Sequence, residues 1–155
     1  MTSRPQAQPT GRVWQLLTGG LVALLALAVA HDVDHLVNQD TLGGLGIFFW
    51  LLLPVQYAAF GLTLWLVATR DPRAAGVATL LCATVLVGFV TAHVLPFGLA
   101  PYSDTDPGTL SWALVFAPVA VAAFSLVAAL RLRAQAPLRL RPGPHQLGDL
   151  RQGVG

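Results

Sequence analysis

The chain has 155 residues, of which 55% are hydrophobic and only 10% are charged. A soluble domain carries about 25% charged residues, so this chain has too few to cover its surface in water. So apolar a composition also excludes an intrinsically disordered chain, and the single cysteine, Cys82, excludes a disulfide-bonded scaffold. The net charge is only +2 and the arginines are scattered among apolar segments, so the sequence has no basic patch of the kind that binds nucleic acid. The class that remains is an integral membrane protein.

Four apolar segments are long enough to cross a bilayer as helices, because a hydrocarbon core of about 30 Å needs about 20 helical residues. These segments cover residues 13–37, 45–69, 74–97 and 110–130. The short connections between them predict an all-α, up-down four-helix bundle in the membrane, over residues 13–133. The flanking residues 1–12 and 134–155 are rich in Pro, Gln, Gly and Arg, and we expect them to be disordered.

The arginines predict how the bundle is oriented, because cytoplasmic flanks of membrane spans collect positive charge. Every arginine lies before the first span, between the second and third, or after the fourth, whereas Asp40, Asp104 and Asp106 lie in the other two connections. We therefore expect both termini in the cytoplasm of a multi-pass cell-membrane protein. All cations are Arg and all anions are Asp, which suggests a GC-rich, bacterial genome.

The N-terminal residues also permit a second interpretation. They have the pattern of a cleavable signal peptide. That pattern consists of arginines within residues 1–12, an apolar run over 21–29, and the small residues Ala28, Val29 and Ala30. Cleavage there would expose His31 as a new N-terminus, whose amine and ring chelate copper. The apolar segment begins at Val13, however, and is longer than the usual signal-peptide core, which favours a membrane span.

Ionisable residues inside the predicted spans mark the candidate functional site, because such residues are expensive in a membrane. The first span contains His31, Asp32, Asp34 and His35, and the third contains His93. At a rise of about 1.5 Å per residue, His31 lies about 28 Å and His93 about 30 Å from the cytoplasmic flank. The two spans therefore place their histidines at one level, near the outer interface.

Helical geometry places the residues of the first span on a common face. With His31 as the reference, His35 lies at about +40° and Asp34 at about −60°, whereas Asp32 lies at the edge, at about +100°. The i, i+4 spacing of His31 and His35 presents two imidazoles to one metal ion. Residues 31–35, His-Asp-Val-Asp-His, resemble the H-E-x-x-H motif of the zinc metalloproteases. In that family the two histidines bind zinc and the glutamate is the general base; Asp32 stands at the glutamate position with a side chain one methylene shorter.

We expect His31, His35 and His93 to supply three nitrogen ligands for zinc, iron or copper, with Asp34 as a fourth ligand or as a partner that orients an imidazole. Asp32 and Asp34 are the candidate catalytic groups. Pro54 interrupts the second span next to Gln56 and Tyr57, which we expect to face the resulting cavity as cofactor-binding groups. The simpler alternative is that these polar residues only hydrogen-bond with their neighbours at a hydrated helix end.

Three functions fit this pattern. The first is a membrane metalloprotein; if it is catalytic, it is a metal-dependent enzyme whose lipidic substrate enters from the outer leaflet. The second is a haem-binding electron carrier with one axial ligand from His31 or His35 and the other from His93, although no arginine lies nearby to meet the propionates. The third is a non-enzymatic transporter or an accessory subunit, whose partners are other membrane subunits as well as the lipid bilayer. Nucleic acid is not an expected partner.

Overall fold

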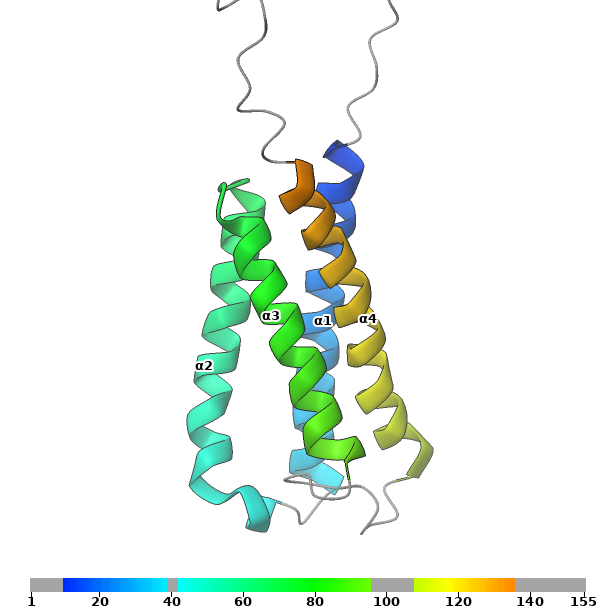
Figure 1. Ribbon diagram of the computed structural model, residues 1–155. Coiled ribbons are helices and arrows are strands. Elements are labelled where there is room, and N and C mark those ends of the chain that lie inside the picture. Colours follow the sequence, from blue (N-terminus) through cyan, green and yellow to red (C-terminus); the bar gives the residue numbers. More distant parts are fainter. Residues whose placement is uncertain (1–9, 39–41, 96–107, 136–155) are drawn as a thin grey trace, which may run out of the picture.

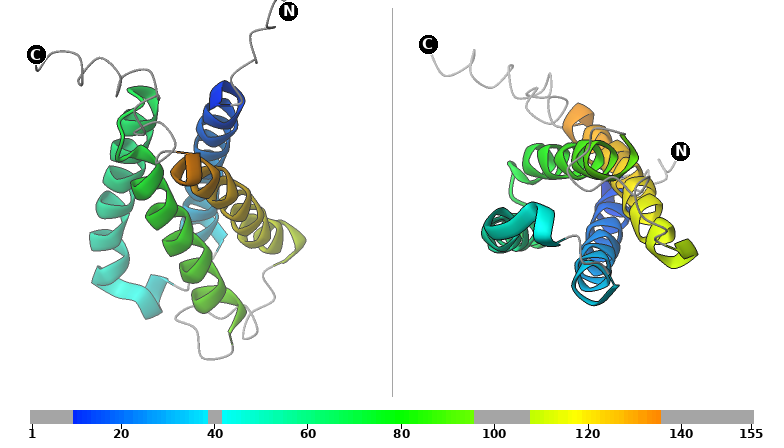
Figure 2. Two further views of the ribbon diagram at one scale, coloured as in Figure 1. Left: turned by 45° about the horizontal axis from the view of Figure 1, so that its top comes forward. Right: turned by 90° about the horizontal axis from the view of Figure 1, so that it is seen from below.

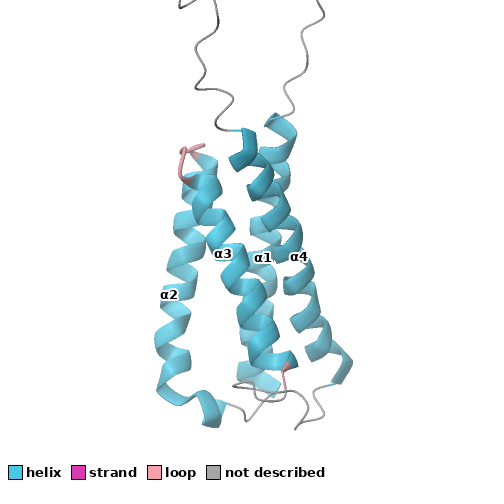
Figure 3. Cartoon of the chain, in the orientation of Figure 1, coloured by secondary structure: helices cyan, strands magenta, loops and turns pink. Residues whose placement is uncertain are grey.

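The computed structural model describes residues 10–38, 42–95 and 108–135, and the regular structure in these ranges is helical (Figure 3). The elements in chain order are α1 (Thr10–Asn38), α2 (Leu42–Ala68), α3 (Ala74–Phe89), the π-helical turn η1 (Val90–Val94) that continues α3, and α4 (Gly108–Gln135). Successive helices run in opposite directions (Figure 1). An all-helical up-down arrangement is thus confirmed.

The helix boundaries differ slightly from the predicted spans. α1 and α4 extend beyond residues 13–37 and 110–130 at both ends, and the third helical segment stops at Val94. Most residues expected to be disordered, 1–9 and 136–155, lie outside the described ranges. Residues 39–41, between α1 and α2, and residues 96–107, between η1 and α4, also lie outside them. Helices therefore account for nearly all of the described chain.

All four long helices carry the length and composition of membrane spans: Gly11–Val37, Trp50–Ala68, Ala74–Val94 and Gly108–Gln135. Large apolar side chains point outward from each of them, including Val22 of α1, Val55 of α2, Leu80 of α3 and Leu110 of α4. In water such an apolar exterior would promote association, whereas lipid chains can solvate it. The four helices are consistent with a multi-pass membrane protein.

The helices do not pack equally. α4 makes the most extensive interfaces, with α1 and with α3, whereas α2 packs less against its neighbours α1 and α3. Two further views show α2 standing apart from the other three helices (Figure 2). Leu17, Leu21 and Leu24 of α1 are fully buried in the core, together with Phe60 of α2, the largest of the fully buried side chains among the described residues.

A glycine allows the close approach of α1 and α4. A Cβ atom built on Gly20 would collide with Oγ of Ser125, which is itself fully buried. Small residues at such a contact let helix backbones approach in apolar surroundings, where packing supplies much of the stability. Ala122 and Ala129 continue the small-residue surface of α4 into the core.

The start of α1, the turn between α2 and α3, and the end of α4 lie at one end of the bundle (Figure 1). Arg70 adopts a left-handed backbone conformation in this turn, and the backbone N–H of Arg73 donates to Oδ1 of Asp71 at 2.7 Å. The arginines of the described residues all belong to this end: Arg12, Arg70, Arg73, Arg131 and Arg133. We call it the arginine end.

Candidate metal centre

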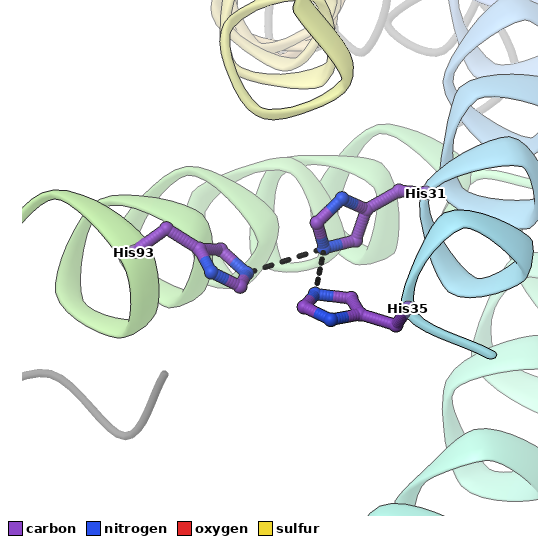
Figure 4. A group of neighbouring side chains, drawn as sticks. All are labelled: His31, His35 and His93. Carbon is purple, nitrogen blue, oxygen red and sulfur yellow. Dashed lines mark hydrogen bonds between the residues drawn. The ribbon is translucent and has the colours of Figure 1, made fainter. Parts of the chain in front are cut away.

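Three histidines meet at the opposite end of the bundle, which we call the histidine end (Figure 4). Nε2 of His31 lies 3.0 Å from Nε2 of His35 and 3.2 Å from Nε2 of His93. One possible ligand atom from each residue lies within 4.8 Å of the other two, and all three residues are buried. The structure therefore brings together the three histidines that the sequence placed at one level.

α1 positions two of these rings. His31 and His35 are one helical turn apart on the buried face, and their ring centroids lie 4.4 Å from each other. Val33, between them in sequence, is 49% exposed on the opposite side of the helix. The helical periodicity of α1 thus produces the shared face that the sequence predicted.

The π-helical turn η1 positions the third ring. The backbone N–H of Leu95 donates to the carbonyl of Val90 at 3.2 Å, and Leu95 itself has an extended backbone. Leu95 precedes Pro96, and a residue before proline disfavours the helical conformation, so the helix ends here. π-helical turns are frequent at functional sites. This one carries His93 toward α1 (Figure 4).

Phe89 is a site residue that the sequence analysis missed. Its ring centroid lies 4.7 Å from that of His31 and 5.8 Å from that of His93, and the rings of His35 and His93 are stacked at 5.2 Å. Its position four residues before His93 was the available signal, because such residues share a helix face. Contacts on several sides restrict how far the imidazoles can rotate.

The two aspartates of α1 are both buried. Asp32 accepts a hydrogen bond of 2.5 Å from the hydroxyl of Tyr57, so its carboxylate is directed toward α2. Asp34 interacts electrostatically with His31. The group of ligand atoms within 4.8 Å contains the three histidines and, among the described residues, neither aspartate. The roles of Asp34 as a ligand and of both aspartates in catalysis stay predictions.

Of the two cofactor-binding candidates on α2, Tyr57 reaches the site through Asp32. Gln56 is half-buried, and its side chain makes no hydrogen bond within the part of the chain that the structure describes. Pro54 lies inside α2, which continues as a helix on both sides of it. A cofactor contact from Gln56 or Tyr57 stays a prediction.

Two of the three nitrogen–nitrogen distances are close to those around a metal ion. Zinc–nitrogen bonds of about 2.0–2.1 Å at tetrahedral angles place neighbouring nitrogens about 3.3–3.4 Å apart. The two Nε2 distances of 3.0 and 3.2 Å are close to that value. Each ring nitrogen of a neutral imidazole has either one proton to donate or one lone pair to accept with. Nε2 of His31 can therefore form a hydrogen bond with only one of the other two rings at a time. A metal ion accepts a lone pair from all three rings at once.

No family model, curated protein or solved structure matches this chain. The functional argument therefore depends on the site itself: three buried imidazoles, two buried carboxylates and a bundle of apolar helices.

Proposed function

We propose that this protein is an integral membrane metalloprotein that binds one zinc, iron or copper ion through His31, His35 and His93. The observation that supports it best is the convergence of three buried Nε2 atoms from two helices. Three protein nitrogens also leave a coordination position open, as catalytic metal sites require.

The charge distribution supports an orientation in which the site lies near the outer face of a cell membrane. The described arginines lie at the arginine end, and positive charge is retained on the cytoplasmic side. Under this proposal both termini are cytoplasmic, and a lipidic substrate reaches the histidine end from the outer leaflet.

A metal ion bound there would supply a Lewis acid or an activated oxygen nucleophile. Asp34 is next to His35 in α1, and we assign it the fourth coordination place or the task of orienting an imidazole. Asp32, with its partner Tyr57, is the proposed proton acceptor for chemistry at the site. The function is then that of a metal-dependent membrane enzyme.

The geometry gives less support to the alternatives. A haem takes two axial imidazoles, one on each face of the porphyrin, whereas three imidazoles converge here, and Nε2 of His31 contacts Nε2 of both His35 and His93. For a transporter, the described spans contain no further Asp, Arg or His between the histidine cluster and the arginine end that would continue a path. An accessory-subunit role has no specific observation in its favour.

The experiment that tests the proposal is metal analysis of protein purified without a histidine tag and reconstituted in lipid nanodiscs. We expect about one transition-metal ion per chain. Single variants His31→Ala, His35→Ala and His93→Ala should each lose the ion, whereas His145→Ala, which removes a histidine outside the described residues, should retain it. Absence of metal from the wild type after loading, or its full retention in His93→Ala, would contradict the three-histidine site.

A further inference from the structure

The arginine end of the bundle carries more positive than negative charge. Its five arginines are all exposed, and none of them forms an ion pair with an acidic side chain of the described residues. Asp71 is the one acidic side chain at this end among the described residues, and it lies in the turn between α2 and α3. The ends of α1 and α4 therefore present exposed arginines to any negatively charged partner.

Packing of α1 against α4 brings three of these arginines to nearly the same level. The contact between Gly20 and Ser125 marks one level of the two helices, which run in opposite directions (Figure 1). Arg12 precedes Gly20 by eight residues, and Arg133 follows Ser125 by eight. Each of them is therefore about 12 Å further toward the arginine end, and Arg131 lies within about 3 Å of that level. Because α1 and α4 pack extensively, these arginines extend from a well-packed pair of helix ends.

Exposed apolar side chains lie next to these arginines, one step further into each span. Leu16 is one helical turn from Arg12 and is 48% exposed, and Leu130 adjoins Arg131 and is 47% exposed. Trp14, two residues from Arg12, is half-buried. Tryptophan is enriched at the level of lipid headgroups, where one side of the ring meets apolar chains and the other meets water. The surface thus has a cationic rim and an apolar part directly inside it.

We propose that Arg12, Arg131 and Arg133 form a binding site for the phosphate group of an anionic phospholipid, whose acyl chains lie along Leu16 and Leu130. A guanidinium group donates two parallel hydrogen bonds to phosphate oxygens, and basic clusters beside membrane spans are typical of anionic-lipid sites. A free phosphate ion would meet the charge but would leave the exposed leucines uncovered. The proposal requires the four helices to lie in a bilayer and is independent of the metal site.

The test measures dissociation constants for anionic phosphatidylglycerol and zwitterionic phosphatidylcholine, by native mass spectrometry of the full chain released from detergent micelles. Arg12→Gln combined with Arg133→Gln removes two positive charges from the proposed site and keeps long polar side chains. Arg131→Gln tests the third arginine independently. Arg70→Gln combined with Arg73→Gln is the matched control, because it removes the same charge from the same end of the bundle but from the turn between α2 and α3.

We expect the wild type to bind phosphatidylglycerol at least about five-fold more tightly than phosphatidylcholine, the effect of one basic side chain near a membrane surface. Arg131→Gln should weaken phosphatidylglycerol binding by about five-fold and the Arg12, Arg133 double variant by up to about 25-fold, with phosphatidylcholine binding unchanged.

The turn variant should lose much less. Equal binding of the two lipids by the wild type, equal losses in the two double variants, or equal losses for both lipids in the site variants would overturn the proposal. Displacement of phosphatidylglycerol by inorganic phosphate at constant ionic strength would assign the arginines to the free ion instead and would also overturn it. His93→Ala should bind phosphatidylglycerol as tightly as the wild type, so failure of this site and failure of the metal site are observed separately.

Discussion

His31 and His93 are separated by 62 positions in the sequence, and their Nε2 atoms lie 3.2 Å apart. The contact joins α1 to the π-helical turn at the end of α3. Elsewhere α1 and α3 touch little, because each packs mainly against α4. A metal ion held between these histidines would therefore connect two helices that have little direct packing of their own.

The first prediction is that bound metal stabilises the bundle. A ligand that binds only the folded protein, at a free concentration of about 100 times its dissociation constant, adds about 2.7 kcal/mol to the stability. Addition of a strong chelator should therefore lower the melting temperature of the metal-loaded protein in detergent by several degrees, as followed by circular dichroism. His93→Ala provides the control, since its melting temperature should not respond to the chelator. An equal response in that variant would mean that the stabilising metal binds elsewhere.

The hydrogen bond between Tyr57 and Asp32 leads to the second prediction, because α2 packs less extensively than the other helices. Tyr57→Phe leaves the buried carboxyl group of Asp32 without its donor, and a hydrogen bond contributes about 0.5–3 kcal/mol, with the upper half of that range for charged acceptors. We expect a loss of stability within that range, measured by unfolding in mixed detergent and dodecyl sulfate micelles.

The double variant Tyr57→Phe with Asp32→Asn is the matched test of this pair. It leaves no unpartnered carboxylate, so the combined loss should be smaller than the sum of the two single losses. Strict additivity, or a Tyr57→Phe variant as stable as the wild type, would show that the contact does not stabilise α2.

The relation between His31 and His35 was predictable because it depends on one helix alone. A period of 3.6 residues fixes which side chains share a face, and the rise per residue fixes their level. His93 was placed at the right level by the same arithmetic, but whether it faced α1 depended on the rotation of a second helix. The π-helical turn that sets this rotation leaves no periodic signal. The i, i+4 spacing of Phe89 and His93 is a periodic signal, but the contact of Phe89 with His31 depends on packing between helices.

Asp32 shows a similar limit. Its predicted angle of about 100° from His31 already placed it at the edge of the site. That its carboxylate accepts a hydrogen bond from Tyr57 depends on the register of α2 against α1, which no local pattern in either segment specifies. The four spans, in contrast, follow from composition and length. A long apolar helix crosses the hydrocarbon core and also satisfies its own backbone hydrogen bonds there.

The third prediction concerns the contact between α1 and α4 at Gly20. Gly20→Ala would place a methyl group against Oγ of the buried Ser125, so the helices must separate or a side chain must shift. Overpacking of this kind costs about 1–3 kcal/mol. We expect a corresponding loss of stability on unfolding in mixed micelles.

Two variants control for the change in helix propensity. Gly19→Ala alters the neighbouring residue of the same helix, where a Cβ meets nothing within 4 Å, and should be neutral or slightly stabilising. Ser125→Ala combined with Gly20→Ala removes the obstructing hydroxyl and should recover much of the lost stability. A Gly20→Ala variant as stable as Gly19→Ala would contradict the close approach of α1 and α4.

The fourth prediction tests the orientation of the bundle. Cys82 is fully buried, and Cys82→Ala provides a background in which single cysteines can be introduced. Val37→Cys reports on the histidine end, because Val37 is the last residue of its span and is 72% exposed. Asp71→Cys reports on the arginine end, because Asp71 lies in the turn between α2 and α3. In bacterial spheroplasts, a membrane-impermeant maleimide should label Val37→Cys directly, whereas it should label Asp71→Cys only after lysis, because the arginines hold that end in the cytoplasm. The reverse pattern would place the histidine cluster at the cytoplasmic face, so that its metal and its substrate would have to come from inside the cell.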